Sequence, residues 1–256
     1  MTTTQPIQSL DRGLVLLEAV ADAQRPVSLS ELTPVLGIDR SSVFRLANTL
    51  VRRGFLTQLP DSKRYMLGSS IWRLASLFRF ENVLLQVARP HVDALVADTG
   101  ETTYVAIREG TQAVLIERQL TAQALGVMGA KSGTGIPLHC TGVGKALIAD
   151  FDHDRLVGLF GEAPLKRFTK RTITTLAALA EACGQTHACG YAVDDEEGHE
   201  GVRCIGAPIR DASGEVVAAV GISAPITRLP REAVKKTGAR VSAAAEAIGR
   251  ELGHGN

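Results

Sequence analysis

Aromatic residues are scarce in this sequence of 256 residues, since Phe, Tyr and Trp together make up only 4% of it. Proteins that bind single-stranded nucleic acid stack successive bases on aromatic side chains, so the composition argues against an extended platform of that kind. Charge of one sign is also lacking, because 28 basic side chains nearly cancel 27 acidic ones. Taken whole, this balance argues against a protein built mainly to coat nucleic acid or an anionic membrane.

Cysteine pairs and long hydrophobic runs are missing as well. The four cysteines include no CxxC pair and are too sparse for a disulfide scaffold. The longest apolar run is about seven residues, at 216–222, whereas a membrane helix needs roughly 20. The first ten residues have neither a basic leader nor an apolar stretch, so no secretory signal is expected. We therefore expect a soluble, cytoplasmic protein with reduced thiols and no membrane partner.

The charge that is present is unevenly distributed. Residues 1–80 carry ten basic and six acidic side chains, a formal charge of +4, whereas residues 81–256 carry −3. Residues 39–64 alone hold six basic and two acidic side chains. A local excess of this kind indicates an anionic partner for one part of the chain. Charge alone leaves open the alternative of a solvated face with chance clustering.

The first eighty residues have the pattern of three helices. Leu10, Leu14, Leu17 and Val20 recur at helical spacing, which predicts an amphipathic helix over residues 8–23. A capping box from Ser28 to Glu31 begins a second, short helix that ends near Gly37. A third helix runs from an Asp39 cap to Gly54, and its predicted buried stripe consists of Val43, Leu46, Ala47, Leu50 and Val51.

Two short β runs, at 55–58 and 63–67, follow around a turn and predict a hairpin with basic residues. Three helices and a basic hairpin predict a winged helix-turn-helix domain, whose third helix enters the major groove of double-stranded DNA. Arginines there can reach phosphates or guanine edges, and short hydroxyl side chains permit close approach. The candidate DNA-binding residues are Ser28, Arg40, Ser41, Ser42, Arg45, Asn48, Lys63 and Arg64. A helical hairpin used for protein contacts is the alternative.

An apolar helix over 71–78 then leads towards a second helix at 83–98. Such a helix must bury its apolar face, and a dimer contact or interdomain packing is favoured over a ligand site. Dimerisation would match the two-fold half-sites usual for this motif. The expected organisation is a DNA-binding domain at 1–68, a linker helix at 69–82 and a second domain at 83–256.

The second domain mixes strands and helices. Strands are predicted at 102–107, 113–118, 191–196, 203–209 and 215–223, and helices at 141–149, 152–160, 173–189 and 231–252. This order predicts an α+β domain with a mainly antiparallel sheet flanked by helices.

Several motifs in this domain are incomplete. Lys145 follows glycines as in a P-loop, but the motif's first glycine would fall at His139 and its Ser/Thr at Ala146. In the acidic run 194–197, we expect Asp195 and Glu197 to lie at a solvated strand end. Buried structural cysteines are favoured over reactive ones. We therefore expect no enzyme activity, no metal and no cofactor.

Two alternatives from other classes stay open: a Cys-dependent hydrolase that uses Cys140 or Cys204, and a metal or thiol sensor that uses His139, Cys140 and Cys204. The start of the helix at 141–144 offers free N–H groups that could bind a small anion without any catalytic residue.

Motifs in both domains carry a resemblance to a known family. They are Ser9-Leu-Asp-Arg-Gly-Leu14, Gly37-Ile-Asp-Arg-Ser-Ser-Val-Phe-Arg-Leu46, Leu138-His-Cys-Thr-Gly-Val-Gly-Lys-Ala146, Gly190-Tyr-Ala-Val-Asp-Asp-Glu-Glu197 and Gly201-Val-Arg-Cys204. In this order the chain resembles the IclR family of bacterial transcription regulators over nearly its whole length. The resemblance implies a winged helix-turn-helix domain, a linker helix and a GAF-like effector-binding domain, in homodimers or dimers of dimers.

The resemblance also implies operator DNA as one partner and a small organic acid or related metabolite as effector. Carried over residue by residue, effector contacts fall on Gly142, Val143, Asp194, Cys204 and Ser223. Apolar lining is expected from Leu125, Val127, Met128 and Val202. Some members carry a second Ser where this chain has Gly221. A hydroxyl donor is therefore missing, and the effector is expected to be less polar or placed differently.

Overall fold

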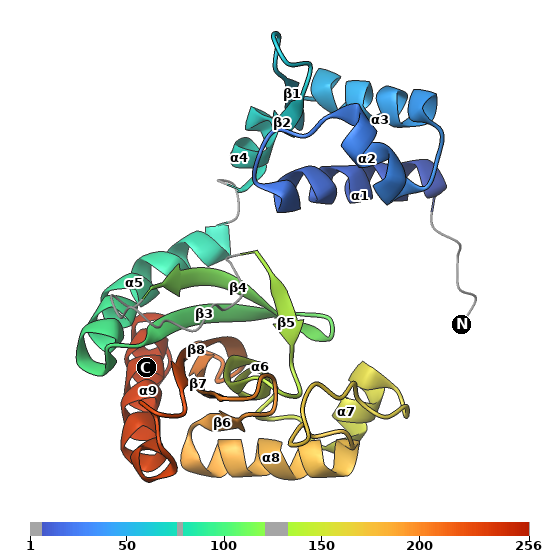
Figure 1. Cartoon of the computed structure of the whole chain (residues 1–256). Helices are drawn as coiled ribbons and strands as arrows, with labels where there is room; N and C mark the ends of the chain where they lie inside the picture. Colours follow the sequence, from blue (N-terminus) through green and yellow to red (C-terminus); the bar gives the residue numbers. More distant parts are fainter. Residues whose placement is uncertain (1–6, 76–78, 121–132, 256) are drawn as a thin grey trace. The chain divides into compact units, whose positions relative to one another are not determined.

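The computed structural model describes residues 7–75, 79–120 and 133–255. The chain divides into two compact units, Met1–Phe80 and Glu81–Asn256, and each is described by itself (Figure 1). Among the described residues, no helix is both long and apolar enough to cross a membrane.

The first unit consists of α1 (Gln8–Ala23), α2 (Leu29–Leu36), α3 (Arg40–Arg52), the hairpin of β1 (Leu56–Gln58) and β2 (Tyr65–Leu67), and α4 (Ser69–Ala75). The predicted capping box is present, because the Ser28 N–H donates to Glu31 Oε2 at 2.8 Å and the Glu31 N–H donates to Ser28 Oγ at 3.4 Å. Asp39 caps α3 by accepting from the Ser42 N–H at 2.9 Å. The winged helix-turn-helix prediction is confirmed.

A small hydrophobic core holds these elements together. It contains Leu16 and Val20 of α1, Leu32 of α2, Val43 of α3 and Tyr65 of β2. The predicted helix over 8–23 is confirmed as α1, although Leu10 and Leu14 leave 61% and 51% of their surface exposed. The core is too small to reach the first turns of α1.

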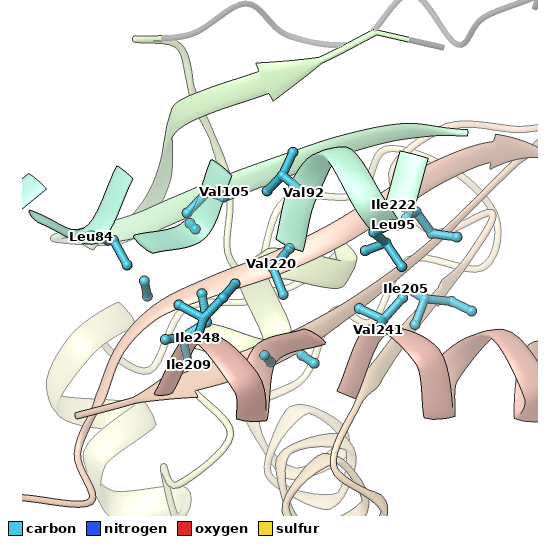
Figure 2. Packing of buried hydrophobic residues seen from close by; sticks show 14 of the residues in the cluster. Leu84, Val92, Leu95, Val105, Ile205, Ile209, Val220, Ile222, Val241 and Ile248 are labelled. Atoms are coloured by element: carbon cyan, nitrogen blue, oxygen red, sulfur yellow. The ribbon is translucent and has the colours of Figure 1, made fainter. Parts of the chain in front are cut away.

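The second unit is built on a six-stranded antiparallel sheet in the order β5-β4-β3-β8-β7-β6. The strands are β3 (Thr102–Glu109), β4 (Gln112–Gln119), β5 (Gly135–Pro137), β6 (Ala192–Asp195), β7 (Val202–Arg210) and β8 (Val216–Pro225). Helices α5 (Arg79–Thr99) and α9 (Arg231–Glu251) pack on one face. Figure 2 shows their labelled side chains meeting those of β3, β7 and β8. The predicted α+β class is confirmed.

The other face of the sheet packs against α6 (Gly142–Leu147), α7 (His153–Phe160) and α8 (Leu176–Cys189). The contact between α6 and β7 is made by glycines. A Cβ atom added to Gly206 of β7 would lie 2.4 Å from the carbonyl carbon of Gly142. The backbone of α6 can therefore lie directly on the strand, and the start of the helix is fixed against the sheet.

Some boundaries differ from those predicted. Helix α8 begins at Leu176 rather than near 173, because the Thr175 side chain caps it by accepting from the Ala178 N–H. Helix α4 is anchored to the first unit, since the Ser70 hydroxyl donates to the Arg53 carbonyl at 2.9 Å.

Candidate functional site

A cavity of about 240 Å³ lies between the sheet and the start of α6 in the second unit. Its polar lining includes Cys140, Thr141, Asp194, His199, Cys204 and Ser223, and its apolar lining includes Tyr104, Leu115, Ile136, Val143, Phe168 and Val202. A mostly apolar cavity with a few convergent polar groups is typical of a small-molecule site.

Strand register explains why distant residues meet here. Cys204 of β7 lies opposite Asp194 of β6 on one side and opposite Ser223 of β8 on the other. Residues directly opposite each other in antiparallel strands share a face of the sheet, so the three side chains form one polar row. The Cys204 Sγ and Ser223 Oγ atoms are 3.2 Å apart.

The effector residues implied by the family resemblance gather around this cavity where the structure describes them. Gly142, Val143, Asp194, Val202, Cys204 and Ser223 all line it. The N–H groups of Gly142 and Val143 belong to the first turn of α6, where a helix offers no carbonyl partner of its own. Leu125, Val127 and Met128 lie outside the described residues.

The carboxylate of Asp194 accepts hydrogen bonds from the backbone that follows it in the chain. Its Oδ1 accepts from the N–H groups of Glu197 at 2.7 Å and Gly198 at 3.3 Å. Desolvation by burial outweighs these bonds and raises the pKa of Asp194 to about 6. The carboxyl can therefore take up a proton near neutral pH and act as either donor or acceptor towards a ligand.

The expectation of a solvated strand end at Asp195 and Glu197 was wrong. Glu197 is buried, and its Oε1 accepts from the Lys145 ammonium, which also donates to the Val193 carbonyl at 2.5 Å. Asp195 is half-buried and accepts from Arg171, Arg203 and Arg231. The Lys145–Glu197 pair joins α6 to the turn after β6, which the acidic run alone does not reveal.

The thiols near the cavity are protonated. Burial raises the pKa of Cys140 to about 12 and that of Cys204 well above its usual range. The His139 ring nitrogen Nε2 contacts the Lys166 carbonyl at 2.9 Å, so it is not available to activate Cys140. A thiolate nucleophile is disfavoured. Within residues 7–75, 79–120 and 133–255, no three His, Cys, Asp or Glu side chains are grouped as metal ligands.

Tyr104 is a cavity residue that sequence reasoning missed. It is only 7% exposed, and its hydroxyl has no hydrogen-bond partner among the described residues. Burial raises its pKa. Tyr104 of β3 lies opposite Gly221 of β8. The alternation in 102–107 predicts a strand but does not reveal which face meets a cavity.

In the first unit, α3, the start of α2 and the hairpin surround a surface hollow. Four of the predicted DNA-binding residues line it: Ser28, Arg40, Ser41 and Lys63. Arg45 is exposed on α3, while Ser42 and Asn48 are half-buried there. Phe44 and Gln58 also line the hollow and were not predicted.

Hydrogen bonds within the unit fix several of these side chains. The Ser28 hydroxyl donates to Glu31 Oε2 at 2.7 Å, and the Ser41 hydroxyl donates to Asp39 Oδ1 at 2.6 Å. Arg64 donates to the Pro26 carbonyl at 3.0 Å and to Glu31 at 3.1 Å, so it ties the hairpin to α2. The hydrogen bonds from Ser28 lower the pKa of Glu31 to about 2.

Comparison with known families matches both units. Residues 9–60 match the IclR helix-turn-helix domain, and residues 81–250 match the C-terminal domain of the bacterial transcriptional regulator IclR.

Individual proteins give the same result. The chain is 33% identical to the transcriptional repressor IclR of Escherichia coli K12 over 96% of its own length and 90% of the relative. It is 34% identical to the repressor AllR of Salmonella paratyphi A, over 98% of its own length and 92% of the relative. A crystal structure of an IclR homologue from Microbacterium hydrocarbonoxydans in complex with 4-hydroxybenzoate has the same fold, with a TM-score of 0.81, 24% identity and coverage of 95% of this chain and 98% of that one.

Proposed function

The chain belongs to the IclR family of bacterial transcriptional regulators, and from that premise we propose how its two units divide the work. The first unit binds operator DNA. The cavity of the second unit binds a small organic acid that modulates this binding. The curated relatives are repressors, which are not enzymes.

One observation supports the effector site most directly: the cavity places hydrogen-bonding groups from four parts of the chain around an apolar space. The N–H groups of Gly142 and Val143 suit one carboxylate, and Ser223 and Cys204 offer a hydroxyl and a thiol beside it. The apolar walls suit the body of the ligand. Asp194, when protonated, accepts such an acid without charge repulsion.

For DNA, we propose that Arg45 and Arg40, both exposed on α3, reach guanine edges or phosphates, and that Lys63 of the hairpin contacts the backbone. The Ser41 hydroxyl already donates its hydrogen bond to Asp39, so towards DNA this hydroxyl acts as an acceptor. Arg64 acts mainly by positioning the hairpin.

The protein works as a homodimer or a dimer of dimers in the cytoplasm. Trp72 and Leu74 on α4 leave 78% and 42% of their surface exposed in the single chain, and a second copy would cover them. The effector changes operator affinity only through its different affinity for two arrangements of the dimer, a coupling of typically about 1–3 kcal/mol.

A thermal-shift screen of small organic acids, 4-hydroxybenzoate among them, tests the cavity. A hit should raise the melting temperature of the wild-type protein and change its affinity for a DNA fragment from the region upstream of its own gene. Ser223→Ala should lose most of the thermal shift, whereas Ser213→Ala, an exposed serine of the same unit, should keep it. An equal shift in both variants would place the ligand outside the cavity.

A further inference from the structure

Phe44 is an exposed aromatic residue on a helix whose other large apolar side chains face the core. It leaves 46% of its surface exposed, whereas Val43 and Ala47 of the same helix are completely buried. Residues three and four apart lie on one side of a helix. Phe44 is exposed together with Ser41, three residues before it, and with the adjacent Arg45, in the N-terminal half of α3.

The hollow around Phe44 combines basic and hydrogen-bonding side chains with apolar surface from Leu29 and Tyr65. Phe44 lines this hollow between α3 and the hairpin together with Arg40, Ser41, Gln58 and Lys63. An exposed ring flanked by the cations of Arg40 and Lys63 does not suit a purely apolar partner. Such a ring suits a polyanion that presents one apolar group where the helix meets it.

The major groove of DNA has one such spot, since thymine carries the only methyl group on its floor. A phenyl ring has no donor or acceptor and would leave the N7, O6 or N4 groups of other bases without a partner. We propose that Phe44 reads a thymine methyl in each operator half-site, and so sets a sequence preference next to the base contacted by Arg45. This inference rests on the proposed entry of α3 into the major groove.

The test removes only the methyl group. Operators are first selected from random duplexes with the full-length protein. Each thymine is then replaced singly by deoxyuridine, and affinity is measured by gel shift. One position in each half-site should weaken wild-type binding about three- to tenfold, the value of one buried methyl group. Phe44→Ala should weaken binding to the thymine operator by at least as much and should lose all sensitivity to deoxyuridine at that position.

Two further variants interpret the result. Phe44→Leu should keep part of the methyl sensitivity, and Thr49→Ala, an exposed residue later on α3, should keep all of it. Deoxyuridine sensitivity that is unchanged in Phe44→Ala would overturn the proposal. If Arg45→Ala weakens binding while Phe44→Ala does not, the inference fails but α3 still enters the groove. If neither variant weakens binding, the proposed role of α3 fails as well.

Discussion

The two units satisfy their polar side chains in different ways. In the first unit, the polar side chains at the starts of α2 and α3 take partners that are near in sequence and exposed, as in Ser28 with Glu31 and Asp39 with Ser41. In the second unit, the partners are far apart in sequence and buried, as in Lys145 with Glu197. Exposed side chains of α3 such as Arg45 can therefore change their contacts without disturbing the fold, whereas Asp194 and Glu197 of the second unit are buried.

The largest expected effect concerns the buried Lys145–Glu197 pair of the second unit. Glu197→Ala leaves the Lys145 ammonium buried without its counter-charge, which should lower the free energy of unfolding of the second unit by about 3–5 kcal/mol. Urea unfolding measures it. Glu200→Ala, an exposed neighbour, serves as control and should change stability by less than about 0.5 kcal/mol. A similar, small loss in both variants would show that the pair is not coupled to the fold.

The next effect concerns Arg45, an exposed side chain of the first unit. Arg45→Ala should weaken operator binding by about 1–3 kcal/mol if the guanidinium makes a bidentate base contact. Because Arg45 is exposed, the free energy of unfolding and the effector affinity should stay within error. Gel shift and urea unfolding of the same variant measure both. A loss of stability equal to the loss of DNA affinity would remove the distinction between the two units.

Acid should act in opposite directions on two carboxyl groups, Asp194 of the second unit and Glu31 of the first. The pKa of Asp194 is raised to about 6 in the folded state, so the fold binds this proton more tightly than the unfolded chain does. Its contribution to stability therefore grows by about 2 kcal/mol as the pH falls from about 7 to about 4. The pKa of Glu31 is lowered to about 2, so its contribution is present above its ordinary pKa and is lost as the pH falls towards 2.

Urea unfolding across this pH range, with Asp194→Asn and Glu31→Gln beside the wild type, separates the two groups. The asparagine variant should lose the gain at low pH, and the glutamine variant should lose part of the decline. Parallel pH profiles for all three proteins would contradict the assignment.

The smallest effect concerns Tyr104. Its buried hydroxyl has no hydrogen-bond partner among the described residues, so Tyr104→Phe should leave the free energy of unfolding unchanged within about 0.5 kcal/mol or raise it slightly. Calorimetry without a ligand measures this change. A clear loss of stability would show that the Tyr104 hydroxyl already has a hydrogen-bond partner, as the Asp194 carboxylate does.

The same contrast decides what could be predicted from the sequence. The capping box of α2, the Asp39 cap and the hairpin depend on residues within a few positions of each other, and the pattern predicted them correctly. The burial of Glu197 depends on Lys145 across the fold, and no local pattern carries that information. The exposure of Leu10 and Leu14 was missed for a similar reason, since helical periodicity does not reveal how far a core extends.

For the candidate sites, six of the cavity residues were expected from the sequence and the family resemblance, and strand register explains why Asp194, Cys204 and Ser223 meet. Tyr104 and Phe44 were missed because their types are usual in a strand and in a helix core. Only the three-dimensional arrangement shows that one has an unpartnered hydroxyl and the other is exposed.

The glycine contact between α6 and β7 also limits how this cavity can be redesigned. A Cβ atom at Gly221 would lie 2.5 Å from the Ile205 carbonyl oxygen, and one at Gly206 would meet Gly142 at 2.4 Å. A serine cannot simply be introduced at Gly221, because the backbone would have to move. A redesign of this cavity for a new effector must therefore keep the glycines and vary the apolar lining residues, such as Leu115, Ile136, Phe168 and Val202.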